Sequence, residues 1–257
     1  MSRCALLAPA LIGLGSVLAS AGAMAGQNVD YQVDGEAFQG YFAPAASSSK
    51  GSVLIIHDWD GLTDYERKRA DMLAEAGYDA FAVDLYGAGN RPEEIDARKA
   101  EMAVLYDDRE RMRRLTLAGL TQAREQGAGE DTVVMGYCFG GAVVLEMARA
   151  NADDSVRGFA TFHGGLDTPE GQGYSADTPP ILVAHGGADA SIGMDQVAAL
   201  SEELEAAGAP YEIQVYSGAP HAFTVFGSDR YQARADQASW AAFHQLLRRT
   251  LEQQDQG

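Results

Sequence analysis

Short apolar runs of strand length alternate with helix-like segments along most of this chain of 257 residues. Ser52–His57 is the most nearly continuous of them, which is typical of a central strand covered by helices on both faces. Further runs of this kind occupy residues 80–84, 132–135, 156–162, 180–185 and 211–216. The alternation predicts an α/β protein with a mostly parallel, doubly wound sheet and helices on both of its faces.

The segment before Ser52 has a different pattern. Apolar residues alternate with polar ones over Val29–Val33, Asp34-Gly35 interrupts them, and the apolar positions resume at Phe38. An Asp-Gly pair between alternating runs is a hairpin signal, so we expect two antiparallel strands at the edge of the sheet.

Helix signals fill the spaces between the predicted strands. Thr63-x-x-Glu66 is a capping box, which predicts a helix from there to Gly77. Pro92 is predicted to open a second helix that extends to about Tyr106. The remaining predicted helices run from after Asp108 to near Gly127, over 142–150, over 194–207 and from about 232 to 251, with a frayed end at 253–257.

The N-terminus has the composition of a secretory signal. Arg3 provides a positive charge, residues 5–18 are apolar, and Ala23-Met24-Ala25 fits a cleavage site. We expect residues 1–25 to be removed and 26–257 to form one domain, exported to the periplasm or secreted. An uncleaved membrane anchor is the alternative. Cleavage would remove Cys4 and leave Cys138 as the single thiol of the mature chain, with no disulfide.

The formal net charge of −18 argues against nucleic acid and anionic membrane surfaces as partners. No membrane association is expected after signal cleavage, and either a monomer or a homodimer is compatible with the sequence. No cofactor or metal ion is predicted.

The run at 132–135 leads into Gly136-Tyr137-Cys138-Phe139-Gly140-Gly141 and then into a predicted helix. A nucleophile at a sharp strand-to-helix turn, with glycines two residues on either side, is the nucleophile elbow of α/β-hydrolases, here with cysteine. A Cβ at either flanking glycine is expected to collide with the neighbouring backbone. The alternative is that Cys138 is only a small buried hydrophobic residue.

Two further residues complete a catalytic triad in the order typical of this fold. Asp189 and His221 follow later predicted strands, and nucleophile, acid, histidine is the α/β-hydrolase order. His221 would accept the thiol proton and Asp189 would orient the imidazole. The competing candidates for the base are His57 and His163, which also end strands, whereas His185 and His244 are interpreted as structural.

An acyl-transfer site also needs donors for the developing oxyanion. The backbone N–H of Phe139 is one candidate, and the loop after Ser52–His57 offers that of Trp59. The Trp59 side chain could also form an aromatic wall of the pocket.

These motifs resemble the dienelactone hydrolase family. The resemblance extends over about 28–251 and depends on the cysteine elbow, on 185–189 (His-Gly-Gly-Ala-Asp) and on 218–223 (Gly-Ala-Pro-His-Ala-Phe), with 79–86 as further support. It implies a single α/β-hydrolase domain, a Cys-His-Asp triad, no cofactor, and hydrolysis of enol-lactones or related esters through an acyl-enzyme. Tyr86 and Phe223 become candidates for the substrate pocket.

Two features depart from the family pattern. The family has a glutamate after the first central strand that helps to activate the thiol; Asp58 stands there and is assigned as thiol-activating or as a pocket residue. The family's two carboxylate-binding arginines correspond to Ala88 and Val225. Arg91 and Arg230 lie close enough in sequence to replace them in the pocket, although a surface position is the simpler interpretation for each.

The leading hypothesis is a cysteine-dependent hydrolase of small esters or lactones. The alternative from another class is a non-catalytic or weakly active member of the fold that binds ligands. A thiol redox role is disfavoured, because the mature chain would have no resolving cysteine.

Overall fold

In the computed structural model, which describes Met1 and residues 26–252, eight strands form one sheet in the order β1-β2-β4-β3-β5-β6-β7-β8. The strands are β1 (Gln27–Val33), β2 (Glu36–Ala43), β3 (Ser52–Ile56), β4 (Asp79–Val83), β5 (Thr132–Tyr137), β6 (Val156–Phe162), β7 (Ile181–Gly186) and β8 (Tyr211–Tyr216). From β4 to β8 all neighbours are parallel. The predicted mostly parallel sheet is confirmed.

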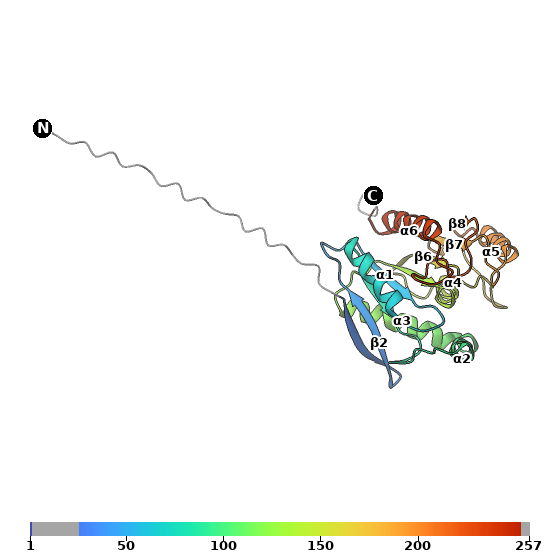
Figure 1. Cartoon of the computed structure of the whole chain (residues 1–257), viewed down its shortest axis with the longest axis horizontal. Helices are drawn as coiled ribbons and strands as arrows, with labels where there is room; N and C mark the ends of the chain where they lie inside the picture. Colours follow the sequence, from blue (N-terminus) through green and yellow to red (C-terminus); the bar gives the residue numbers. More distant parts are fainter. Residues whose placement is uncertain (2–25, 253–257) are drawn as a thin grey trace.

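The N-terminal hairpin is confirmed at one edge of the sheet. β1 pairs antiparallel with β2, and β2 pairs antiparallel with β4. Asp34 and Gly35 both adopt positive φ in the turn, which explains the Asp-Gly pair there. Figure 1 shows this hairpin at one end of the molecule and the β7–β8 pair at the other.

Six α-helices are described: α1 (Asp64–Glu75), α2 (Ile95–Asp107), α3 (Arg109–Glu125), α4 (Phe139–Ala150), α5 (Met194–Ala207) and α6 (Ala233–Leu247). Apolar side chains of α1 and α6 pack with one face of the sheet, and those of α2, α3, α4 and α5 pack with the other. Helices therefore cover both faces, as predicted, and bury the central strands completely (Figure 1).

Three predicted helices have different bounds. α4 begins at Phe139, three residues before its predicted start. The first hydrogen bond of α2 joins the Arg98 amide to the Glu94 carbonyl, so the helix begins three residues after Pro92. The Pro92 carbonyl instead accepts a hydrogen bond from the Arg98 side chain. The last predicted helix is divided, because α6 ends at Leu247 and a π-helical turn (Arg248–Glu252) follows it.

The predicted capping box of α1 is confirmed. The Thr63 hydroxyl accepts a hydrogen bond from the Tyr65 amide, and the Glu66 carboxylate accepts one from the Thr63 amide at 2.8 Å. The predicted signal segment at 1–25, apart from Met1, and the predicted frayed end at 253–257 lie outside the described residues. None of the helices in the described part of the chain has the length and apolar character needed to cross a bilayer.

Candidate active site

Cys138 lies at the sharp turn between β5 and α4, at the carboxyl edge of the sheet. Its φ of 50° and ψ of −110° are unusual for a residue with a side chain and mark a strained backbone. A Cβ on Gly136 would lie 2.3 Å from the Gly140 carbonyl oxygen, and one on Gly140 would lie 2.4 Å from that of Ile56. The expected collisions are confirmed, so only glycine fits on either side of this turn.

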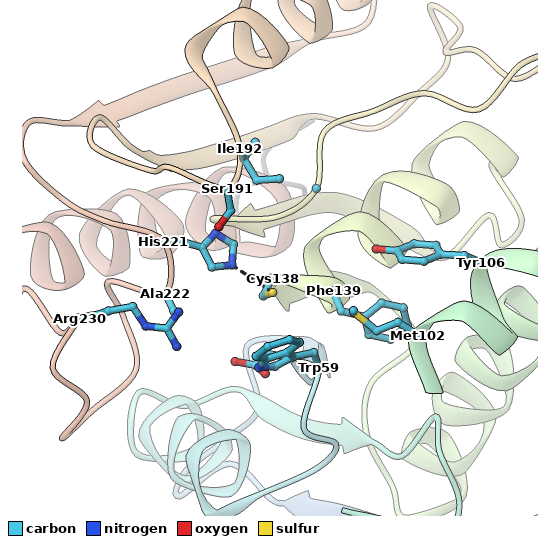
Figure 2. Close-up of a pocket in the computed structure, with 12 residues that line it drawn as sticks. Trp59, Met102, Tyr106, Cys138, Phe139, Ser191, Ile192, His221, Ala222 and Arg230 are labelled. Carbon is cyan, nitrogen blue, oxygen red and sulfur yellow. Dashed lines mark hydrogen bonds between the residues drawn. The ribbon is translucent and has the colours of Figure 1, made fainter. Parts of the chain in front are cut away.

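His221 lies between Cys138 and Asp189. Its Nε2 is 3.1 Å from the Cys138 Sγ, and its Nδ1 is 2.8 Å from an Asp189 carboxylate oxygen. Figure 2 shows the His221 ring pointing toward the thiol, with Ser191 and Ile192 beside it. Residues separated by up to 83 positions in the sequence therefore come together in the arrangement of a nucleophile, a base and an orienting acid.

The surroundings of the Asp189 carboxylate favour its ionised form. Burial alone would raise its pKa, but the hydrogen bond to His221 and those from the Ile192 and Ser191 amides outweigh this effect. The pKa of Asp189 therefore lies below its ordinary value, so the carboxylate can hold the Nδ1 proton of His221 and leave Nε2 directed at the thiol.

The other histidines lie elsewhere. His57 is fully buried, with Nδ1 2.6 Å from the Asp58 carbonyl oxygen and Nε2 accepting the Leu85 amide. His163 is also buried, and its Nε2 is 2.8 Å from the Thr224 hydroxyl. His185 is buried in β7 and His244 packs against Trp240 in α6. Among the described histidines, only His221 contacts both Cys138 and Asp189.

The surroundings of Cys138 disfavour the charged form of its thiol. Burial raises its pKa to about 12, and the Asp58 carboxyl adds to the increase. The Phe139 amide and the Arg230 guanidinium act in the opposite direction. A thiol with a raised pKa needs a neighbouring base to remove its proton before it can act as a nucleophile, and His221 Nε2 lies within hydrogen-bond reach of the Cys138 Sγ.

Asp58 forms part of the cavity wall and has no hydrogen bond to Cys138. Its carboxylate accepts one from the Asp60 amide at 3.3 Å. Burial, followed by the nearby Asp60 and Glu66 carboxyls, raises its pKa well above the ordinary value. Because a charge on Asp58 would oppose ionisation of the thiol, the geometry fits the pocket assignment of Asp58 better than the thiol-activating one.

Phe139 and Trp59, whose backbone amides are the predicted oxyanion donors, line the same cavity as Cys138. Phe139 is the first residue of α4, where an amide has no partner within the helix, and its N–H is directed at Cys138. Trp59 follows β3, and its amide has no acceptor among the described residues. The Trp59 ring also lines the cavity, below Cys138 in Figure 2.

The catalytic cavity has a volume of about 240 Å³. Sequence reasoning missed the walls provided by Met102 and Tyr106, which lie four residues apart on one face of α2. The sequence did contain one indication of them, because two apolar residues four positions apart lie on a helix that is otherwise mostly exposed. The walls are formed by Asp58, Trp59, Met102, Tyr106, Cys138, Phe139, Gly165, Ser191, Ile192, His221, Ala222 and Arg230.

Of the four predicted pocket residues, only Arg230 lines this cavity, and the described residues give it no ion pair. Tyr86 packs behind Trp59, with its hydroxyl 3.5 Å from the Trp59 carbonyl oxygen. Phe223 is fully buried against His163. Neither Tyr86 nor Phe223 lines the cavity, so their assignment to the substrate pocket is wrong. Each packs against a neighbouring residue instead.

Arg91 needs the same correction. Its guanidinium donates to the carbonyls of Leu62, Gly87 and Asn90, and it lies 3.4 Å from the Asp84 carboxylate. These contacts join the loops after β3 and β4. The Arg91 donors are therefore used within the fold and do not reach the cavity.

The sheet order, the elbow and the position of its nucleophile define an α/β-hydrolase fold. Residues 38–251 match the sequence model of the dienelactone hydrolase family. The chain belongs to this family and is a carboxylic ester hydrolase, which confirms the resemblance inferred from the motifs.

Named relatives of similar length support this assignment. The chain is 27% identical to a probable 2-oxo-3-(5-oxofuran-2-ylidene)propanoate lactonase from Bradyrhizobium sp., over 82% of this chain and 89% of the relative. It is 29% identical to a carboxymethylenebutenolidase from Rhodococcus opacus, over 80% and 82% of the two chains. A dienelactone hydrolase-like promiscuous phosphotriesterase from metagenomic libraries has a similar structure, with a TM-score of 0.80 and 28% identity over 89% of this chain and 99% of that one.

Proposed function

We propose that this protein hydrolyses small esters or lactones through an acyl-enzyme on Cys138. The observation that most supports this is the contact of His221 with both Cys138 Sγ and the Asp189 carboxylate. An uncharged thiol with a raised pKa gains nucleophilicity only if a base takes its proton, and the His221 Nε2 lies at the distance required.

In the first half-reaction the Cys138 sulfur attacks the ester carbonyl while its proton moves to His221 Nε2. The negative charge on the carbonyl oxygen is held by the Phe139 and Trp59 amides, aided by the N-terminal end of α4. The tetrahedral intermediate expels the alcohol oxygen, which takes the proton from His221. An acyl thioester remains on Cys138.

In the second half-reaction His221 takes a proton from water, whose oxygen attacks the thioester carbonyl. The carbon–sulfur bond breaks, the carboxylic acid leaves, and the sulfur recovers the proton from His221. For a lactone the alcohol and the acid are the two ends of one opened molecule.

The hydrolysis of p-nitrophenyl acetate by the wild-type protein and by Cys138→Ala tests this proposal. We expect release of nitrophenolate by the wild type and loss of nearly all turnover in the variant, with an unchanged thermal unfolding midpoint. Equal turnover by the two proteins would remove Cys138 from the mechanism.

A weakly active protein that mainly binds its ligand is the second candidate, and the raised pKa of the Cys138 thiol is the observation that favours it. The two candidates predict different behaviour of the thioester. In a binder any acyl group transferred to Cys138 would persist, whereas the hydrolase must release it in each cycle.

Export to the periplasm or beyond, after cleavage near Gly26, is part of the proposal and is tested by the N-terminal sequence of the protein recovered from each compartment.

A further inference from the structure

A second cavity of about 320 Å³ adjoins the catalytic one and shares Tyr106, Gly165 and Ile192 with it. The catalytic cavity alone is smaller than the roughly 300–1,000 Å³ of typical ligand pockets, whereas the two together fall within that range. Figure 2 shows Tyr106 and Arg230 on opposite sides of Cys138. The second cavity therefore extends the site away from Arg230.

Two arginines, Arg109 and Arg149, line the second cavity, and both pair with a carboxylate that does not line it. Glu146 is almost fully buried in α4, and its carboxylate is paired with Arg109 at 3.0 Å, with Arg149 at 3.4 Å and with Arg113. Three guanidinium groups thus surround one carboxylate. Partly buried charges are screened less than fully exposed ones, so they are expected to attract a ligand of the opposite sign.

Of the two arginines that line the second cavity, Arg109 is the one with unused donors. Arg149 also donates to the Gln172 side chain at 2.7 Å and to the Tyr174 hydroxyl at 3.0 Å, so most of its capacity is used. Among the described residues Arg109 has Glu146 as its single hydrogen-bond acceptor, although a guanidinium carries five N–H donors. Its guanidinium lies 5.4 Å from the centroid of the Tyr106 ring, which separates the two cavities.

One acid also lines the second cavity. Asp167 is exposed and accepts a hydrogen bond from Gln196 at 2.9 Å. Its charge is screened by solvent more strongly than that of the partly buried Arg109, so the wall at Arg109 remains cationic. The lining between them, Tyr106, Ala142 and Ile192, is apolar and suits a hydrocarbon chain.

We propose that the second cavity binds the far end of a long acyl group, and that Arg109 binds a carboxylate at that end. The substrate class is then the monoester of an aliphatic dicarboxylic acid, with its ester carbonyl at Cys138 and its methylene chain along Tyr106. This inference depends on the proposed function, because the acyl group must reach Cys138.

Matched pairs of aryl esters test the inference. Each pair consists of a p-nitrophenyl monoester of succinate, glutarate, adipate or suberate and the same compound with its distal carboxylate methylated. For at least one chain length we expect kcat/KM of the wild type to be about tenfold or more higher for the free acid, since charge-assisted hydrogen bonds have this effect. The preference should decrease as salt is added.

Three variants locate the effect. Arg109→Gln should bring the acid-to-methyl ratio close to one. Arg114→Gln is the matched control, because Arg114 lies on the same helix but pairs with Asp34 and does not line this cavity, and it should keep the wild-type ratio. Ala142→Leu, which fills the cavity without changing charge, should lower the rate for suberate relative to succinate.

The outcomes separate the two proposals. If the wild type hydrolyses the esters through Cys138 but shows no preference for the acids, or if the preference survives in Arg109→Gln, the second cavity is not a carboxylate subsite. If Cys138→Ala hydrolyses all the esters as fast as the wild type, the proposed function itself is wrong.

Discussion

The Nε2 of His221 lies 3.1 Å from the Sγ of Cys138, although burial raises the pKa of that thiol to about 12. The raised pKa favours the protonated form of the thiol. Ionisation of the sulfur then depends on the charges around it, and two of them, Asp58 and Arg230, have opposite signs and can be changed separately.

Asp58→Asn should make Cys138 more reactive. A charged Asp58 raises the pKa of the thiol, so its removal should lower that pKa and increase the thiolate fraction below it. We expect alkylation by iodoacetamide at about pH 8 to accelerate by up to about tenfold, the effect of one pKa unit. Asp64→Asn, at an exposed carboxyl that starts α1, is the control and should leave the rate unchanged. A slower reaction in Asp58→Asn would instead support the thiol-activating role.

Arg230→Gln should have the opposite effect. The Arg230 guanidinium lowers the pKa of Cys138, so its loss should raise the pKa and slow alkylation by a few-fold at about pH 8. The exposed Arg234, which donates to the Ser217 carbonyl, provides the control variant Arg234→Gln. Equal alkylation rates for Arg230→Gln and the wild type would mean that the guanidinium does not act on the thiol.

Gly136→Ala should disrupt the elbow. The added Cβ would lie 2.3 Å from the Gly140 carbonyl oxygen, and backbone atoms cannot move away as a flexible side chain can. We expect a loss on the order of 3 kcal/mol in the free energy of unfolding, together with loss of esterase activity. Gly173→Ala, where a Cβ would meet nothing within 4 Å, should be close to neutral in urea unfolding. A fully stable and active Gly136→Ala would contradict this account of the turn.

Glu146→Gln should alter the pH dependence of stability. Burial alone would raise the pKa of Glu146, but hydrogen bonds from Gln172 and Arg113 and the charges of Arg149 and Arg109 lower it below the ordinary 4.5. A lowered pKa stabilises the fold above pH 4.5, and this contribution is lost as the pH falls through the folded-state pKa. The variant should therefore be less stable at neutral pH, by about 3 kcal/mol, and the difference should shrink in acid.

Urea unfolding of the wild type and Glu146→Gln at about pH 7 and below about pH 4 measures this difference. Glu110→Gln, at an exposed position in the first turn of α3, is the control. A constant difference across the pH range would show that the Glu146 charge does not stabilise the fold.

The sequence was sufficient to predict the sheet and the elbow because both depend on local requirements. A strand buried on both faces must be apolar throughout, as β3 is, and a turn with crowded backbone on both sides must have glycine at 136 and 140. The order of Cys138, Asp189 and His221 follows from the topology, which brings the ends of parallel strands to one edge.

The walls of the pocket were harder to predict, since they depend on where side chains point. Arg91 and Arg230 seemed equivalent from their spacing, but three loop carbonyls take the donors of Arg91 while Arg230 faces the cavity. Tyr106 lines the site only because α2 packs near the elbow, with the Tyr106 and Phe139 rings 5.5 Å apart. Such contacts join segments that are distant in the sequence, so no local pattern contains them.

The most direct test of the central claim is the mass of the protein during turnover. After rapid mixing with p-nitrophenyl acetate and acid quenching, the wild type should carry one acetyl group on Cys138, and the adduct should disappear once the substrate is exhausted. His221→Ala should form little of it. Steady hydrolysis by the wild type with no acetyl group on Cys138 at any time would contradict acyl-cysteine catalysis.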